Sequence, residues 1–174
     1  MTSKFLESKH EATSEEKLHA FGYGPWVEEV DYAKWEYKGI ICQAQRNDLG
    51  CWCGYIEVPK DHPWFDEDET NMTVDVHGGL TYAGNRFDEH FVVGFDCAHS
   101  SDICPFQPSY NKRMKKDLKD QYDEQAMQIK ESIKRLEELE AKYFSKHERS
   151  YKDINFVIAQ CESLVDQMLD VKEN

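Results

Sequence analysis

The chain has 174 residues and a formal charge of −13 at pH 7, with 21 basic and 34 acidic side chains. Hydrophobic residues make up 40% of the sequence and aromatic residues 13%, which is enough to form a core and argues against a disordered chain. The negative charge argues against a nucleic-acid backbone or a membrane surface as the partner, because both are anionic. It does not exclude a small anionic ligand in a local pocket.

Residues 1–16 are polar and charged, without the apolar stretch that a secretory signal needs. No run of about 18 apolar residues occurs, so no transmembrane helix is expected. The C-x-C pair at Cys51 and Cys53 has no second pair at metal-binding spacing and is interpreted as two buried thiols. We expect a cytoplasmic protein in which all six cysteines are reduced: Cys42, Cys51, Cys53, Cys97, Cys104 and Cys161.

Residues 1–20 are predicted to be a mobile or weakly helical lead-in, followed by an ordered aromatic loop at Phe21–Trp26. Strands at Tyr37–Ala44 and Gly50–Val58 flank a polar turn, which is typical of a β-hairpin. A loop is expected from Val58 to Thr70, because two prolines interrupt it. Further strands are predicted at Met72–His77, Leu80–Ala83 and His90–Asp96.

The last third of the sequence has helical periodicity. Apolar residues recur at helical spacing from Lys112 to about Tyr143, within an otherwise charged segment, and again on one stripe of Asp153–Val171. The sequence therefore predicts an α+β fold, with a small, mostly antiparallel sheet packed by a C-terminal helix, plus a long charged helix. Residues 1–109 and 147–174 would form a single domain, and 110–146 a helical insertion or arm that either packs on the sheet or joins two copies of the chain.

The strongest local signal is a pair of apolar segments that each run into polar side chains. In VDVHGGLTY, His77 is followed by Gly78 and Gly79, which lack Cβ atoms and so allow a ligand or a backbone to approach closely. In HFVVGFDCAHSSD, Asp96 and His99 follow an apolar strand. If both segments are strands of one sheet, they bring His77 close to the second group.

Asp96, His99 and Asp102 are spaced three residues apart, so a turn could gather them around one centre. Imidazoles and carboxylates suit a divalent metal such as Zn²⁺ or Mn²⁺, and His77 could complete the set. Cys97 and Cys104 flank the group as alternative soft ligands. The structural alternative is that the two aspartates cap turns while His99 makes a buried hydrogen bond.

A second candidate region is the loop containing His62 and Trp64. Trp64 or Phe65 could stack on a nucleobase while His77 or Arg86 contacts a phosphate. Alternatively, Trp64 and Phe65 close the open end of the core, and the sequence favours this interpretation somewhat. The acidic run Asp66–Glu69 is interpreted as a solvated turn.

Four blocks, CGYIEVPKDHPWF, VDVHGGLTYAG, GFDCAHSSDICP and YKDINFVIAQCESLVDQM, resemble a family of small uncharacterised proteins of bacteriophages and prophage-bearing genomes. The resemblance covers about half the chain and implies a context, the cytoplasm of an infected host, without a mechanism. The most distinctive blocks contain His62, His77, Gly78, Gly79, Asp96, His99 and Asp102.

Three functions fit this sequence. The favoured one is a phage-type accessory protein that binds a small phosphate-bearing or nucleotide-like ligand, to counter host defence. The first alternative is a metal-dependent hydrolase with ligands at His77, Asp96, His99 and Asp102. The second is an interaction module whose helical arm binds a host protein or a second copy of the chain. The sequence leaves open whether any reaction is catalysed.

Overall fold

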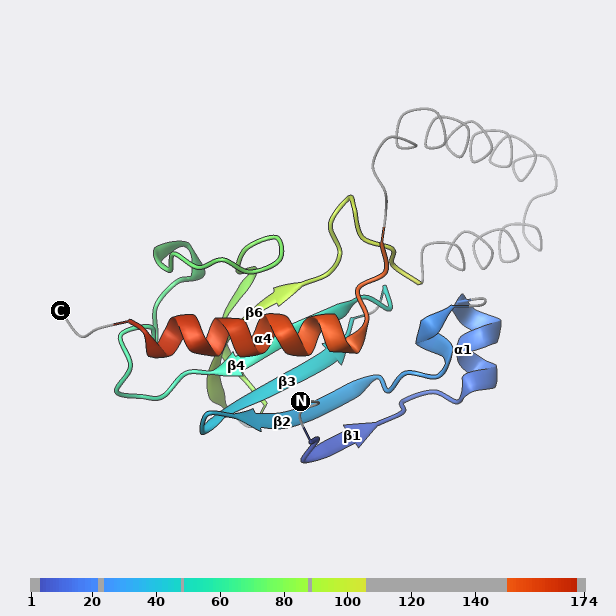
Figure 1. The fold of residues 1–174 in the computed structure, drawn as a ribbon, viewed down its shortest axis with the longest axis horizontal. Coiled ribbons are helices and arrows are strands. Elements are labelled where there is room, and N and C mark those ends of the chain that lie inside the picture. The colour runs from blue at the N-terminus through green and yellow to red at the C-terminus, as the bar shows by residue number, and fades with distance from the viewer. Residues whose placement is uncertain (1–3, 22–23, 48, 88, 106–149, 172–174) are drawn as a thin grey trace.

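The computed structural model describes residues 4–21, 24–47, 49–87, 89–105 and 150–171. Within them, six strands form one antiparallel sheet in the order β1-β2-β3-β4-β6-β5. Figure 1 shows helix α4 lying along one face of this sheet. The elements are β1 (Glu7–Lys9), α1 (Ser14–Phe21), η1 (Pro25–Val27), β2 (Tyr32–Tyr37), β3 (Ile40–Arg46), β4 (Trp52–Glu57), η2 (Glu69–Asn71), β5 (Tyr82–Arg86), β6 (His90–Asp96) and α4 (Ile154–Leu169).

The main core lies between α4 and the sheet. On β4, alternation places Trp52, Gly54 and Ile56 on the face toward the helix. A Cβ on Gly54 would lie 2.8 Å from the sulfur of Cys161, so this glycine lets the helix approach the sheet closely. The buried stripe of α4 is Val157, Cys161, Leu164, Val165 and Met168. The predicted antiparallel sheet and its C-terminal helix are therefore confirmed.

The opposite face of the sheet has a smaller cluster of its own. Tyr55 and Val92 are buried there, and the rings of Tyr82 and Phe87 pack against them. The guanidinium of Arg86 lies 4.7 Å from the centroid of the Tyr55 ring. The Arg86 guanidinium therefore packs on aromatic rings, on the face of the sheet that points away from α4.

Two strand predictions were wrong. No strand was predicted at β2, where buried residues alternate with partly exposed ones, and the predicted strand Tyr37–Ala44 corresponds to β3. Met72–His77 is not a strand: it runs beside α4, where Gln167 bonds both backbone groups of Asp75, at 2.7 and 2.9 Å. Glutamine side chains of the helix satisfy this backbone in place of a neighbouring strand.

Buried charges tie α1 to the sheet. The Lys17 side chain is only 1% exposed, and its ammonium lies 2.9 Å from Asp31. Arg46 donates to Asp31 at 3.1 Å and to Glu29 at 2.6 Å. Glu29 also accepts from the Tyr151 hydroxyl, close to the start of α4. This network joins the N-terminal residues, β3 and the segment before α4 into one unit.

Cys51 and Cys104 form a disulfide, which corrects the expectation that all six cysteines are free. The bond ties the residue before β4 to the loop after β6. The other cysteines, Cys53 among them, are free and buried. The interpretation of the C-x-C pair as buried thiols therefore holds for Cys53 and fails for Cys51.

The predicted long charged helix, and with it the arm at 110–146, lies outside the described residues. The segments on either side of it share one core, since α4 packs on β3 and β4. The domain limits at 109 and 147 stay predictions. Among the described helices, none has the length and apolar character needed to cross a membrane.

Candidate functional site

His77 lies at the end of the extended segment beside α4. Its backbone N–H donates to the side-chain oxygen of Gln160 on the helix, at 2.7 Å. Its ring packs edge-on against Phe156, one turn earlier on α4, with the ring centroids 5.2 Å apart. Val76, the preceding residue, is buried in the core. The helix therefore holds both the backbone and the ring of His77.

His99 and Asp102 lie in the loop after β6, which folds into a tight turn. The Asp102 backbone N–H donates to the His99 carbonyl at 2.9 Å, and the His99 N–H donates to Asp102 Oδ2 at 3.0 Å. The far side of the turn pairs with residues just before α4, because Ile103 and Ser101 exchange backbone hydrogen bonds with Ser150, at 3.1 and 3.0 Å.

The three side chains meet at the carboxylate of Asp102. His77 Nε2 lies 2.8 Å from Asp102 Oδ2, and His99 Nδ1 lies 3.2 Å from the same oxygen. The Asp102 side chain is fully buried, whereas those of His77 and His99 are 18% and 32% exposed. The buried carboxylate of Asp102 thus lies beneath two imidazoles that reach solvent. One ligand atom from each residue lies within 4.8 Å of the other two.

Gly78 is part of the same arrangement. A Cβ built on Gly78 would lie 2.0 Å from Nε2 and Cε1 of His99, so the imidazole rests directly on the glycine. Gly79 has a similar positive φ, but a Cβ there meets nothing within 4 Å. A close approach beside His77 therefore occurs at Gly78, but the neighbour is a histidine side chain and not the ligand or backbone that the sequence suggested.

The Asp102 carboxyl has a lowered pKa: burial raises it, but hydrogen bonds from the His77 side chain and the His99 backbone outweigh that effect. Its second oxygen, Oδ1, is buried and has no hydrogen-bond partner among the described residues. The Lys152 ammonium lies 3.8 Å from that oxygen. The carboxylate is therefore ionised with one acceptor unused, which is costly unless something binds there.

The fourth residue of the predicted metal quartet lies apart from the other three. Asp96 ends β6 on the face of the sheet away from α4, opposite Cys53, and its side chain accepts the Ala98 N–H at 2.9 Å. The alternative in which the two aspartates cap turns is therefore confirmed for Asp96, and Asp102 likewise accepts the His99 N–H within its own turn. Neither flanking cysteine is available as a ligand, because Cys104 is in the disulfide and burial raises the pKa of the Cys97 thiol far above its ordinary value.

The structure does not bring His62, Trp64 or Arg86 to this cluster. The Trp64 N–H donates to His62 Nδ1 at 3.1 Å, so His62 Nε2 carries the proton and donates to the Met168 carbonyl at 2.9 Å. Trp64 is buried in the core, in agreement with the alternative in which it closes the core. The shared pocket expected from these residues and His77 does not form, because Arg86 lies on the other face of the sheet.

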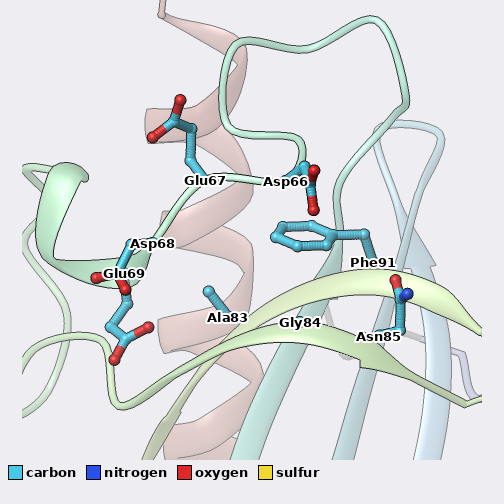
Figure 2. Close-up of a pocket in the computed structure, with 8 residues that line it drawn as sticks. All are labelled: Asp66, Glu67, Asp68, Glu69, Ala83, Gly84, Asn85 and Phe91. Carbon is cyan, nitrogen blue, oxygen red and sulfur yellow. The ribbon is translucent and has the colours of Figure 1, made fainter.

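A pocket of about 400 Å³ lies elsewhere, between the loop after β4 and strand β5. Figure 2 shows the ring of Phe91 between Asp66 and Asn85, and the carboxylates of Asp68 and Glu69 to one side of Ala83 and Gly84. The loop is held by its own hydrogen bonds, among them those from Thr70 to Asp68 at 2.6 and 2.9 Å. The interpretation of Asp66–Glu69 as a solvated acidic turn therefore agrees with the structure.

Lys152 and Phe156, which lie about 50 residues beyond Asp102, were not among the site residues predicted from the sequence. No local motif points to them, because their proximity results from the pairing of Ser150 with the loop after β6. Comparison with known proteins adds no assignment: neither a protein-family model, nor a curated protein, nor a solved structure matches this chain.

Proposed function

We propose that His77, His99 and Asp102 hold one divalent metal ion, and that the site has the arrangement of a metal-dependent hydrolase. The observation that supports this most directly is the convergence of two solvent-reaching imidazoles on one buried carboxylate. Three protein ligands are typical of catalytic zinc sites, which keep a further position for water. A water bound there loses a proton more readily and becomes a nucleophile.

The distances suit such an ion. With metal–ligand bonds of about 2.0–2.1 Å, neighbouring ligand atoms of a tetrahedral site lie about 3.3 Å apart. The two imidazole nitrogens lie 2.8 and 3.2 Å from Asp102 Oδ2. For these two pairs of atoms, shifts of about half an ångström would reach that separation. All three ligand atoms lie within 4.8 Å of one another, so the remaining separation would shorten by up to about 1.5 Å as coordination bonds replace the two hydrogen bonds. The His99 N–H would remain bonded to the carboxylate and orient it.

With both imidazoles in their neutral form, the hydrogen bonding favours a metal over a metal-free anion site. A neutral imidazole has one N–H, and in both His77 and His99 a ring nitrogen faces the ionised Asp102 as its donor. The remaining nitrogen of each neutral ring is then an acceptor, which cannot donate to a phosphate. The positive charge for an anionic ligand would have to come from elsewhere, and a bound cation supplies it.

Zinc binding to tag-free, EDTA-treated protein tests the proposal. Calorimetry should give one site, and zinc at 100 times its Kd should add about 2.7 kcal/mol of stability, a rise of about 5–10 °C in Tm. His77→Ala and His99→Ala should each lower zinc affinity by more than about 100-fold, because each removes a ligand. Two matched controls, His90→Ala and Asp96→Asn, should bind zinc like the wild type.

His90 is a suitable control because its side chain is 57% exposed and pairs with Glu57 at 3.4 Å, outside the cluster. Asp96→Asn keeps an acceptor for the Ala98 N–H and tests the quartet predicted from the sequence. If neither Zn²⁺ nor Mn²⁺ binds stoichiometrically or changes the Tm of the wild type, the proposal is refuted. Asp102 would then be an anchor for two histidines.

A further inference from the structure

Lys152 lies beside the proposed metal site without being one of its ligands. Its ammonium is 3.8 Å from Asp102 Oδ1, 2.6 Å from the Ser150 hydroxyl oxygen and 5.1 Å from the centroid of the Phe156 ring. Phe156 also packs against His77, so its ring contacts both the His77 imidazole and the Lys152 ammonium. The Lys152 side chain is 18% exposed, so it reaches solvent at the mouth of the cluster.

The backbone fixes this position. Asp102 and Ser150 form a parallel bridge, and Lys152 follows two residues later, just before α4 begins. Ser150 donates to the Ser101 carbonyl and accepts from the Ile103 N–H, so it is held on both sides of Asp102. The ammonium is therefore placed by the fold beside the cluster.

Once a divalent metal is bound, the charges of the metal, its ligands and Lys152 do not sum to zero. A divalent ion with two neutral imidazoles and the Asp102 carboxylate leaves one positive charge, and Lys152 adds a second. Among the described residues, Asp102 is the carboxylate that lies within 4.0 Å of the Lys152 ammonium. Asp153 accepts the Phe156 N–H at 2.8 Å and so caps α4, and Asp96 lies on the other face of the sheet. Partly buried charge without compensation is unfavourable, so the site lacks about two negative charges.

We infer that the ligand or substrate of this site carries a dianionic phosphate group, which binds the open side of the metal and the Lys152 ammonium together. This inference rests on the proposed metal site. Among the described residues, Ser150 is the one acceptor that the ammonium donates to, and an ammonium has three donor hydrogens. A phosphate oxygen is a strong acceptor for the others. The chain as a whole is acidic, so this anion subsite is a local feature.

Calorimetry on protein loaded with one equivalent of zinc, at pH 8 and without free zinc, tests the inference. The probes are inorganic phosphate, phenyl phosphate and phenyl sulfate, the last having the same shape with one negative charge less. Phenyl phosphate should bind at least about ten-fold more tightly than phenyl sulfate. Lys152→Met should weaken phenyl phosphate by about ten-fold or more and change zinc affinity by less than about three-fold. Lys152→Arg should restore most of the phosphate affinity.

Lys38→Met is the matched control, because Lys38 pairs with Asp166 on the exposed surface and should not affect either ligand. The inference is overturned if zinc binds while phosphate and phenyl phosphate do not. Equal binding of the phosphate and sulfate esters, or unchanged phosphate binding by Lys152→Met with wild-type Tm, would also overturn it. Those results leave the metal site standing. Failure of zinc binding refutes the proposed function first.

Discussion

Replacing Gly78 by alanine separates backbone strain from displacement of a site residue, because Gly79 provides an internal control. Both glycines have positive φ, +71° at Gly78 and +85° at Gly79. An alanine in that region costs about 1–2 kcal/mol at either position. Only at Gly78 does the new Cβ meet another group, since the His99 ring would lie 2.0 Å away.

The His99 ring would have to retreat by about 1.4 Å to reach an ordinary contact of about 3.4 Å. It can do so, because the side chain is 32% exposed, but it then leaves Asp102, whose Oδ2 lies 3.2 Å from its Nδ1. The loss of that hydrogen bond adds about 1 kcal/mol. We therefore expect Gly78→Ala to be destabilised by about 2–3 kcal/mol and Gly79→Ala by about 1–2 kcal/mol.

Metal affinity should distinguish the variants more clearly than stability. A metal site requires its ligand distances to within about 0.2 Å, so a displaced imidazole is no longer a ligand. Gly78→Ala should lose zinc affinity by at least about ten-fold, while Gly79→Ala stays within about three-fold of the wild type. Urea unfolding and zinc calorimetry measure the two effects. Equal zinc affinity in both alanine variants would refute the reasoning, because His99 would then not be a positioned ligand.

Other predictions concern stability. Asp102→Asn should destabilise the metal-free protein by about 1–3 kcal/mol at pH 7. Because the pKa of Asp102 is lowered in the folded protein, its ionised form stabilises the fold at pH values above the ordinary pKa of 3.8, and this contribution is lost as the pH falls. The free energies of unfolding of the variant and the wild type should therefore converge in acid. A difference between them that widens below pH 4 contradicts this. Cys104→Ser should lower the free energy of unfolding by about 4 kcal/mol in urea titrations without a reductant, because the disulfide closes a loop with a sequence separation of 53. The wild type in reducing buffer should be destabilised by the same amount. Lys17→Met should cost about 2–3 kcal/mol, because it removes one of the two cations that pair with the buried Asp31 carboxylate, and Arg46 remains as the other. The exposed pair at Lys38 should contribute less than about 1 kcal/mol when it is removed. Similar thermal shifts for the two lysine variants would argue against the buried network.

The sequence alone determined the elements whose pattern is local. The apolar centre of His90–Asp96 predicted β6 with its observed limits. The stripe beginning at Ile154 predicted α4, and its members from Val157 onward form the buried face. These predictions succeed because burial on one side imposes the period of the element on the sequence. The grouping of His99 with Asp102 belongs here too, since three residues of a turn are enough to bring them together.

Only the tertiary structure decided which other residues join that turn. His77 reaches Asp102 because Gln160 and Phe156 of α4 hold it, and not through the strand pairing that the sequence suggested. Lys152 reaches the cluster through the bridge between Ser150 and Asp102. Such contacts depend on where a helix docks on a sheet, which is the sum of many packing interactions across the core. The residue types at His77, His99 and Asp102 therefore indicated a site, and the packing of α4 decided its composition.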